Sequence, residues 1–593
     1  MKALFLLMFL ALLAPIKAEE IASRVFPDGT EFAIHAPISV LPSGGFFPVR
    51  VEIRNKASES LTWNVRCLSN MDTYGSYRFR GRSSAEGVIR SEFSVSCPAG
   101  EERRIDLLIP VHHIVERMGG SRSINFQCST GGGGRSLGGS IGAQAGSYAV
   151  GMSRSFSERF SGEINSAFRR MKIATSGPSY GSRSSNLYGI IDVARLAEDW
   201  RAYAGYDAFV LTRADIVALT PGVKLALDQW VRSGGNLILL NDGQGEIPGF
   251  EELSMNDGYG VRNRLDCGSD FEGFKSKDFA RVLKPTEESL ATISDTDNRQ
   301  GDWAVGNALG SRTQSKGFLL FALIVFAIVV GPINLFFWAN KNRRHRLFVT
   351  TPIISIAASL LLVGFIVIRD GFGGDGSRAI AIEVGGPDDK SAIILQEQFS
   401  RSGILFSSGF ELDGNSVLNS IVAPVTDLNL DDSVNSTGAY TLNFEQTKEG
   451  WGINGNLFQS RSEQAQLLRA VVPSRERLEL LPGDSGAPRL VSSFSYPLTD
   501  VFYQDGEGKI WMASGISPGE TVTMNASSSV TGRDYGVSEA ISRFGSSHRK
   551  KLNKLVDRPN SFVALATEAP SIATHSSIDW MESPTLITGL LSR

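Results

Sequence analysis

Two long apolar stretches near the middle of the chain constrain its structure more than any other feature. Residues 317–339 read GFLLFALIVFAIVVGPINLFFWA and residues 347–368 read LFVTTPIISIAASLLLVGFIVI, both without a formal charge. A helix of about 20 apolar residues crosses the hydrocarbon core of a bilayer, which is roughly 30 Å thick. A buried helix of a soluble core is the alternative, but two such runs in succession, with charges only at their borders, favour two transmembrane helices.

The connector between these runs, residues 340–346, is short and basic. It carries the basic side chains Lys341, Arg343, Arg344 and Arg346. Short loops rich in Lys and Arg stay on the cytoplasmic side of a membrane, so we interpret these residues as determinants of topology. Nucleic-acid binding is the weaker interpretation, because the patch has no folded basic surface behind it and the chain has a formal net charge of -3. We also expect Asn334 to hydrogen-bond across to the other helix.

The amino terminus has the pattern of a secretory signal peptide. Lys2 precedes an apolar run that Pro15 breaks, and Ala18 offers a small residue for cleavage. Residues 1–18 are therefore predicted to be a signal peptide, with an uncleaved anchor as the alternative. The signal and the basic loop independently predict that residues 19–316 and 369–593 both lie outside the cytoplasm, tied to a bacterial inner (cytoplasmic) membrane.

Residues 19–130 are predicted to form a β-sandwich. Alternation such as that of Val49, Val51 and Ile53 with charged residues indicates half-buried strands, and turn residues separate several such segments. Cys67 and Cys97 fall on core-facing positions. In an oxidising compartment they form a candidate disulfide, and buried free thiols are the alternative.

The next stretch, residues 131–147, is rich in glycine and is predicted to be a linker. Its glycines are too loosely spaced for a phosphate-binding loop. A zinc site is not expected, because the chain has no CxxC pair.

From residue 148 to 310 the pattern changes to that of an α/β unit with a parallel sheet. A continuous apolar run at 208–211 precedes a helix with Thr220 as N-cap and Pro221 at its first position, and the apolar run 236–240 follows. This order is a βαβ unit, and parallel strands with helices on their faces are its expected structure.

These residues resemble the central part of a class I glutamine-amidotransferase-like domain. Over roughly residues 148–370 the chain is similar to uncharacterised bacterial envelope proteins that combine such a domain with a double-transmembrane hairpin. In true amidotransferases a nucleophilic Cys stands on the turn after the second strand of this unit. Here that turn consists of Asn241, Asp242, Gly243, Gln244 and Gly245. No His occurs between His113 and His345 to activate Cys267, so the resemblance implies the fold without its catalysis, with ligand or partner binding at this turn.

Residues 378–593 return to alternating strands and are predicted to be a second β-rich domain, with helical stretches near 461–470 and 537–556. PGDSGAP resembles the nucleophile stretch of chymotrypsin-like proteases, with Ser485 in the nucleophile position, but a turn between strands is the preferred interpretation. The basic segment 546–558 is interpreted as a solvated helix face, with contact to anionic headgroups as the alternative.

Two classes of function remain from the sequence. The first is a non-enzymatic envelope protein anchored in the inner membrane, acting as a binding or accessory subunit of a membrane complex. The second is an extracytoplasmic hydrolase or amidase. No cofactor and no metal site is expected. The expected partners are the lipid bilayer and other envelope or membrane proteins, and nucleic acid is not among them.

Overall fold

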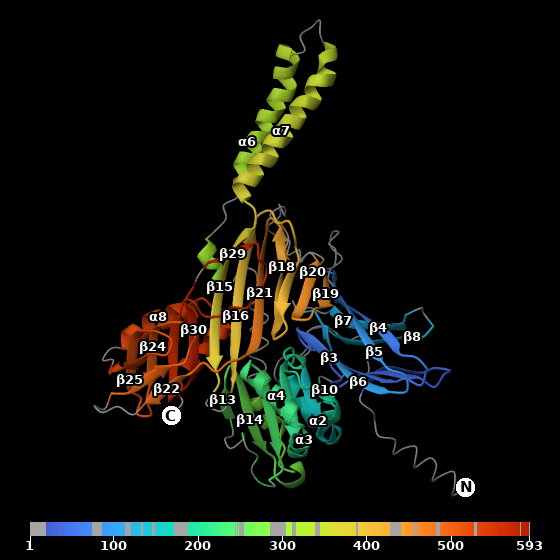
Figure 1. Cartoon of the computed structure of the whole chain (residues 1–593), viewed down its shortest axis with the longest axis vertical. Helices are drawn as coiled ribbons and strands as arrows, with labels where there is room; N and C mark the ends of the chain where they lie inside the picture. Colours follow the sequence, from blue (N-terminus) through green and yellow to red (C-terminus); the bar gives the residue numbers. More distant parts are fainter. Residues whose placement is uncertain are drawn as a thin grey trace.

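The structure is a computed structural model, and a few segments fall outside its description. It describes residues 19–73, 86–112, 120–131, 134–144, 149–170, 188–243, 245, 247, 249, 254–284, 304–310, 316–338, 344–386, 389–426, 440–455, 458, 460–481, 487–526, 530–581 and 583–591. The predicted signal peptide and Ser485 lie outside these residues. Several sheets and a few helices make up the molecule, and one pair of helices projects away from the rest (Figure 1).

Two sheets form the predicted β-sandwich. The four-stranded sheet has the order β1-β2-β3-β6, with β1 (Glu19–Val25), β2 (Glu31–Ala36), β3 (Phe46–Arg54) and β6 (Glu102–Pro110). The seven-stranded sheet has the order β17-β20-β19-β5-β4-β7-β8, with β4 (Leu61–Thr73), β5 (Glu86–Cys97), β7 (Gly120–Thr130), β8 (Ser136–Gln144), β17 (Phe410–Asp413), β19 (Tyr440–Gln446) and β20 (Gly450–Gly455). Trp63 is fully buried between the sheets, with its ring 4.3 Å from that of Phe32. The predicted inward positions Val49, Val51 and Ile53 are buried as well.

Three strands of this sandwich come from beyond the two apolar helices. β19 pairs in parallel with β5, so that Leu442 stands opposite Ile89. Trp451 of β20 stacks on Phe46 at 5.4 Å. The sandwich is therefore built from both halves of the chain and does not end near residue 130.

Two expectations for the amino-terminal region are wrong. Part of the predicted linker is β8, which pairs with β7 along its length. Gly139 fits where β8 approaches Ile21 of β1, because a Cβ there would lie 2.5 Å from the Ile21 carbonyl oxygen. The predicted disulfide is absent, since all four cysteines are free thiols. The register explains why: Ser91 stands opposite Cys67, and Leu61 stands opposite Cys97, so the two cysteines are six positions apart along the ladder.

The predicted α/β unit is a six-stranded sheet with the order β10-β9-β11-β12-β14-β13. Its strands are β9 (Val150–Ser153), β10 (Gly189–Ile191), β11 (Ala208–Thr212), β12 (Asn236–Asn241), β13 (Ser254–Asp257) and β14 (Gly260–Asp266), and all neighbours are parallel except β13 and β14. Its α-helices include α2 (Arg154–Arg170), α3 (Arg213–Ala218) and α4 (Pro221–Arg232), with residues 276–284 also helical. Short 3-10 turns are η1 (Val193–Arg195), η2 (Trp200–Ala202) and η3 (Ser269–Phe271).

The predicted βαβ unit is confirmed in detail. The Thr220 hydroxyl caps α4 by accepting from the backbone N–H of Val223, and Pro221 occupies the first turn. Phe209 on one face of β11 and Val210 on the other are both buried, which separates two cores on the two sides of the sheet. This is the burial expected of a strand covered on both faces.

A ten-stranded sheet dominates the carboxyl-terminal half. Its order is β18-β21-β16-β15-β30-β28-β24-β25-β27, with β29 also pairing β15. The strands are β15 (Gly374–Val384), β16 (Ser391–Ser402), β18 (Ser416–Thr426), β21 (Ser462–Pro473), β24 (Leu498–Gln504), β25 (Ile510–Ile516), β27 (Asn525–Ala526), β28 (Ser561–Ala566), β29 (Ile578–Met581) and β30 (Thr585–Leu590). A small sheet β22-β23-β26 lies beside it, with β22 (Leu478–Leu481), β23 (Arg489–Ser492) and β26 (Thr521–Thr523).

The helical prediction for this half is confirmed at one place and wrong at the other. Helices α8 (Val530–Ser542) and α9 (Ser546–Val556) occupy the region expected to be helical near 537–556. Residues 462–470 of the segment predicted at 461–470 are instead part of β21, which pairs with β16 and β18 on its two sides. Its Glu, Gln, Ala, Leu and Arg residues favour helix, but burial between two neighbouring strands overrides that local preference.

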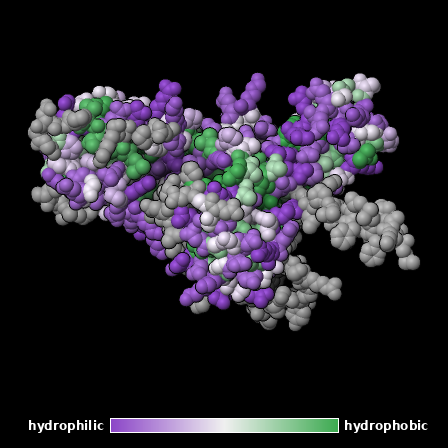
Figure 2. All heavy atoms as spheres, turned by 90° about the horizontal axis from the view of Figure 1, so that it is seen from below, coloured by the Kyte–Doolittle hydropathy of each residue, from purple (hydrophilic) through white to green (hydrophobic). Residues whose placement is uncertain are grey.

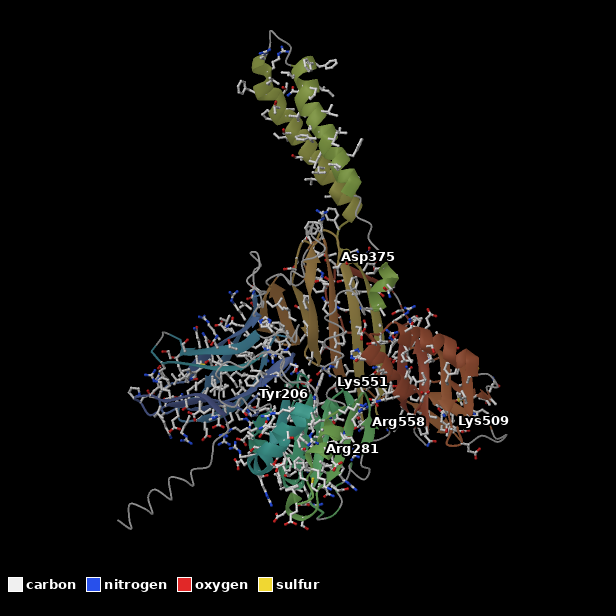
Figure 3. All side chains as sticks on the ribbon, turned by 180° about the vertical axis from the view of Figure 1, so that it is seen from behind. Tyr206, Arg281, Asp375, Lys509, Lys551 and Arg558 are labelled. Atoms are coloured by element: carbon white, nitrogen blue, oxygen red, sulfur yellow. The ribbon has the colours of Figure 1, made fainter. Side chains whose placement is uncertain are left out.

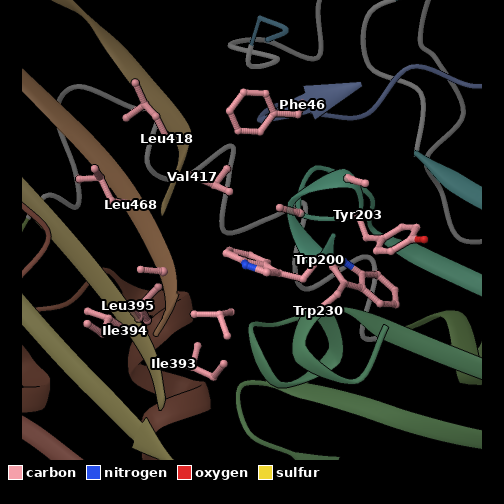
Figure 4. Packing of buried hydrophobic residues seen from close by; sticks show 14 of the residues in the cluster. Phe46, Trp200, Tyr203, Trp230, Ile393, Ile394, Leu395, Val417, Leu418 and Leu468 are labelled. Atoms are coloured by element: carbon pink, nitrogen blue, oxygen red, sulfur yellow. The ribbon is translucent and has the colours of Figure 1, made fainter. Parts of the chain in front are cut away.

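The sandwich, the α/β unit and the ten-stranded sheet share one hydrophobic core. Phe46 of the sandwich, Trp200 and Trp230 of the α/β unit, and Ile393 and Val417 of the ten-stranded sheet belong to a single buried cluster (Figure 4). The parts of the chain before and after the two apolar helices are therefore packed into one body.

The apolar runs form helices that leave this body together. The first consists of α6 (Lys316–Ile328) and the π-helical segment η5 (Val329–Trp338), and the second is α7 (Leu347–Asp370), preceded by the short turn η6 (Arg344–Arg346). Among the described residues, α7 is the helix long and apolar enough to cross a membrane, and Leu323–Phe337 is a shorter apolar helix. The amide of Asn334 donates to the hydroxyl of Thr351 at 3.0 Å, which confirms the predicted bond between the helices. Pro332 stands inside the π-helical segment, where the missing N–H disturbs regular α-helical bonding.

The surface of these helices differs from that of the opposite end of the molecule. Leu361 of α7 is 76% exposed and Phe337 of η5 is 80% exposed. Seen from the end opposite the helices, the body is mostly hydrophilic, with smaller hydrophobic patches near its middle and on its outer parts (Figure 2).

Candidate functional site

The carboxyl edge of the parallel sheet in the α/β unit has the arrangement at which α/β folds bind ligands. β10 and β11 lie on opposite sides of β9. The connection from β9 to β10 therefore runs toward one edge of the sheet, and the connection from β10 to β11 runs back toward the other edge. In sheets of this kind the crevice at such a reversal, outside the carboxyl ends of the strands, is the usual ligand site. Ser153 ends β9 at this point, and Thr212 ends β11 beside it.

Local capping fixes the residues on both sides of this reversal. The Thr212 hydroxyl and backbone N–H both donate to the carboxylate of Asp215, and this capping box begins α3. The hydroxyls of Ser153 and Ser155 lie 3.3 Å apart at the start of α2. Ser153 and Thr212 are buried, and the capping box already uses the Thr212 hydroxyl, so the exposed polar group at this edge is the Ser155 hydroxyl at the amino terminus of α2, a position that suits a polar or anionic group of a ligand.

The structure places the predicted ligand turn at this same edge. Asn241 is the last residue of β12, and its amide donates to the Asp266 carboxylate at 2.6 Å. Arg213, at the start of α3, donates to the carbonyl of Gly245 at 2.8 Å. Gly243 has a φ of 81°, a conformation that favours glycine.

Of the five predicted turn residues, the structure thus brings four to one edge: Asn241, Asp242, Gly243 and Gly245. Gln244 lies outside the described residues. The turn is tied to its neighbours by Arg213 and Asp266, two partners that the sequence analysis did not identify. Arg213 directly follows β11 and Asp266 is the last residue of β14, and these positions at the ends of parallel strands were the available signal.

Cys267 has the chemistry of a structural thiol. It is 2% exposed, its thiol donates to the Leu265 carbonyl, and burial raises its pKa to about 12. A nucleophilic thiol needs a lowered pKa and an activating base. The described histidines with known partners lie in other parts of the molecule: His35, His112, His548 and His575.

The described residues form no group of three or more His, Cys, Asp or Glu side chains that could hold a metal ion. Of the predicted topology determinants, Arg344 and Arg346 lie in η6, directly before α7. Lys341 and Arg343 lie outside the described residues.

The basic helix α9 lies against the body, away from the projecting helices. The Lys551 ammonium is close to Gly234 of the α/β unit, and Figure 3 shows Lys551 and Arg558 well below Asp375, the labelled residue nearest the helix pair. One face of α9 packs on the body, with Leu552, Leu555 and Val556 buried.

Buried charges join the α/β unit to the ten-stranded sheet, and sequence reasoning missed them. Arg232, at the end of α4, forms ion pairs with Glu383 of β15 and with Asp389. Arg469 of β21 donates to the carbonyls of Ser233 and Ala204, and burial lowers its pKa to about 10. A charge inside an apolar strand, such as Glu383 in AIAIEV, was a signal for a buried partner.

A second buried acid stands where the sandwich meets the α/β unit. Asp207, just before β11, accepts from the Ser43 hydroxyl at 3.0 Å and from the backbone N–H of Ala149 at 2.9 Å. Burial raises its pKa to about 6 despite these bonds. Nearby, the Tyr206 hydroxyl (labelled in Figure 3) donates to the carbonyl of Val40 at 3.0 Å.

The ten-stranded sheet also contains a buried row of uncharged polar side chains. Gln398 of β16 faces Gln466 of β21 and donates to its amide oxygen at 2.7 Å. Ser400 faces Gln464 one step along the ladder, and neither side chain has a hydrogen-bond partner. Since buried polar groups are almost always bonded, this row is unusual for a sheet interior.

Comparison with known proteins assigns no family. No family model matches the chain, and no curated protein sequence matches it. Part of the chain is similar to the yeast delta-COP-I mu-homology domain complexed with a Dsl1 WxWxV peptide, at 11% identity over 37% of this chain and 98% of that chain, with a TM-score of 0.17.

Two other solved structures are similar at the same level. The Fcho1 mu homology domain of Danio rerio with a bound Eps15 peptide has 10% identity over 37% of this chain and 97% of that chain, with a TM-score of 0.18. A calcium-binding mutant of Bacteroides uniformis beta-glucuronidase 2 has 10% identity over 47% of this chain and 33% of that chain, with a TM-score of 0.14. Such low TM-scores carry no argument about function or partners.

Proposed function

We propose that this protein is a membrane-anchored, non-catalytic binding or accessory subunit whose two large flanks form one body outside the cytoplasm. The observation that carries the proposal is the pairing of β5 with β19 in one sheet. These strands come from opposite sides of the apolar helices in the sequence. Chain segments that share a sheet lie in one compartment, so the helices between them cross a bilayer an even number of times.

The exposure of the two helices supports a crossing. Side chains such as Leu320, Leu360 and Leu361 are all more than half exposed, although each is strongly apolar. In water such a surface is unfavourable, whereas in hydrocarbon it is the expected one. The bond between Asn334 and Thr351 pairs the amide N–H of a polar side chain that is buried between the two helices.

The basic connector supports the sidedness. Arg344 and Arg346 precede α7, and with Lys341 and Arg343 they make the short loop strongly positive. A positive loop retained in the cytoplasm leaves the body on the other side of a bacterial inner membrane, with lipid and other envelope proteins as its partners.

The state of the α/β edge supports binding over catalysis. The resemblance to amidotransferases would place the nucleophile in the turn that begins at Asn241, and this turn contains no Cys or Ser. Cys267 is buried with a raised pKa. The edge retains the exposed Ser155 hydroxyl at the amino terminus of α2 and the half-buried polar side chains of Asn241 and Asp242, so we assign it the recognition of a polar group on a partner or ligand.

Reporter fusions and co-purification test this proposal. Alkaline phosphatase fused after Arg593 should be active, and green fluorescent protein at the same place should be dark. Extraction in mild detergent should recover the chain with other membrane proteins, and Arg213→Ala at the α/β edge should weaken that association. A cytoplasmic carboxyl terminus would refute the topology. Labelling of Cys267 or Ser485 by an activity-based probe, lost together with turnover on substitution by Ala, would favour the hydrolase instead.

A further inference from the structure

Two exposed phenylalanine rings stand directly beyond the end of α7. Phe372 is 61% exposed and Phe406 is 88% exposed, and their rings stack with centroids 5.3 Å apart. Outside residues 316–370, these are the phenylalanines that the described part of the chain exposes to this degree. Single exposed apolar residues are common and need no explanation, but a stacked pair of exposed large rings forms an apolar patch that does.

The backbone holds this pair in place. The N–H of Gly373 donates to the Ile404 carbonyl, and the N–H of Ile404 donates to the Gly371 carbonyl, both at 3.0 Å. The backbone N–H of Leu405 donates to the Ser460 hydroxyl at 2.9 Å. The two rings therefore belong to a platform of paired backbone segments that is continuous with the ten-stranded sheet.

The same platform is attached to the chain that enters the first apolar helix. Arg401 of β16 donates to the carbonyls of Leu309 and Gly310, a few residues before α6. The short helix η4 (Ala304–Leu309) packs on β15 and β16, with Gly306 against the ring of Phe399. Both ends of the helix pair are thus fastened to one end of the sheet, near Asp375 in Figure 3.

The position of the rings along the membrane normal follows from the length of α7. Its apolar run ends at Ile368, and the helix ends at Asp370. Phe372 follows two residues later, a distance of at most roughly 7 Å along an extended chain. The headgroup region on each side of the hydrocarbon is roughly 5–8 Å deep. From Ile368 the last two helical residues add about 3 Å, so the backbone of Phe372 lies at most about 10 Å beyond the hydrocarbon, at the outer boundary of the headgroup region.

We propose that Phe372 and Phe406 form a seat that inserts into the headgroup region of the bilayer and fixes the body against the membrane. This inference rests on the proposed membrane anchorage and adds a lipid-binding surface to it. Aromatic side chains are favoured at the membrane–water interface, and Phe372 lies two residues beyond the end of α7, after the charged residues Arg369 and Asp370. Lipid is thus the occupant of the seat, and the ten-stranded sheet is held at a fixed height above it.

Site-directed fluorescence in lipid nanodiscs tests the seat on the full chain. The native cysteines are buried, so a cysteine introduced at the surface can be labelled selectively. Ser407→Cys places a fluorophore beside both intact rings. Leu360→Cys reports on the middle of α7, and Val217→Cys, 68% exposed in the α/β unit, reports on water.

We expect brominated lipids to quench the labels at 407 and 360 and to leave the label at 217 bright. Replacing both rings, Phe372→Ser with Phe406→Ser, should restore emission at 407 and leave quenching at 360 unchanged. Quenching at 360 with a bright label at 407 in the intact protein would refute the seat and leave the anchorage standing. A bright label at 360 would refute the anchorage itself.

Discussion

The α/β sheet and the ten-stranded sheet bury their strands in opposite ways. In the α/β unit, β11 and β12 bury apolar side chains on both faces. Their sequences, AFVLT and NLILLN, are correspondingly apolar at successive positions. In the ten-stranded sheet, β16 and β21 are buried to a similar degree but carry glutamine and serine along one face. In the α/β sheet the buried side chains are apolar, whereas in the ten-stranded sheet many buried side chains are polar. Buried polar groups need hydrogen-bond partners to be stable.

Breaking the junction between the two sheets should have the largest effect. Arg232 and Glu383 are less than a tenth exposed, and Arg232→Ala would leave the Glu383 carboxylate buried without its cation. Removing one partner of a buried ion pair costs about 3–5 kcal/mol. We expect urea unfolding of the detergent-solubilised chain, followed by tryptophan fluorescence, to show a loss of this size.

Two variants control for the loss of an arginine as such. Arg66→Ala removes a sandwich arginine whose ion pair with Glu92 is largely exposed, and it should cost less than about 1 kcal/mol. Arg232→Met combined with Glu383→Leu removes both charges and should recover most of the loss. If Arg232→Ala and Arg66→Ala proved equally mild, the buried pair would not hold the two sheets together.

The acid at the start of the α/β sheet predicts a dependence on pH. Burial raises the pKa of Asp207 from 3.8 to about 6, so the folded state favours its protonated form. Its stabilising contribution is complete below its ordinary pKa and is lost as the pH rises through 6. The free energy of unfolding of the native chain, measured relative to Asp207→Asn, should therefore fall by about 2 kcal/mol between pH 4 and pH 7.

The measurement needs both proteins at each pH, since other groups titrate in the same range. Asparagine can still accept the bond from Ala149 but does not ionise. A constant difference between the two proteins across this range would contradict the raised pKa. A difference that grew with pH would mean that Arg122 and Arg469, whose charges act on Asp207, outweigh its burial.

Two glutamines of the ten-stranded sheet test how its buried polar side chains affect stability, with smaller expected changes in the free energy of unfolding. Gln398 is bonded to Gln466 and Thr574, whereas neither amide atom of Gln464 has a partner. An unbonded buried amide costs about 1–3 kcal/mol, so Gln464→Met should raise the free energy of unfolding by about 1 kcal/mol. Gln398→Met should lower it by about 1–2 kcal/mol, because it leaves Gln466 unbonded.

These two substitutions have the same change in side chain and the same burial, so each is the control for the other. Chemical unfolding of both variants gives the sign of each effect. Destabilisation by Gln464→Met as large as that by Gln398→Met would show that Gln464 is bonded in solution, through buried water or a ligand.

The contrast between the sheets also explains which parts of the fold could be predicted. Around α4, every local signal agreed: Thr220 as cap, Pro221 in the first turn, and apolar runs on both sides. In β21, the local composition favoured a helix, and only the pairing with β16 and β18 made it a strand. Pairing between distant segments leaves no trace in a local pattern, so the entry of β19 into the sandwich was also unpredictable.

The candidate site follows the same division. The turn from Asn241 was found because it follows a recognisable buried strand. Arg213 escaped notice because its role depends on the order of strands, which places the ends of β11 and β12 side by side. The ion pair of Arg232 with Glu383 joins residues 151 positions apart, and no sequence spacing indicates it.

Treatment with a reductant should have the smallest effect of all on stability. It tests whether the cysteines of the sandwich and of the α/β unit are all free thiols. Burial raises the pKa of Cys67, Cys97 and Cys128 in the sandwich and that of Cys267 in the α/β unit, so none is poised to react. We expect no maleimide labelling of the native chain and complete labelling after denaturation without reductant. Dithiothreitol should leave the melting temperature unchanged.

A disulfide between Cys67 and Cys97 in the purified protein would require β4 and β5 to slide past each other by six positions, since Ser91 now stands opposite Cys67 and Leu61 stands opposite Cys97. Such a shift is an even number, which keeps the inward face of each strand but breaks every cross-strand pair, so finding that bond would overturn the register of the whole sandwich.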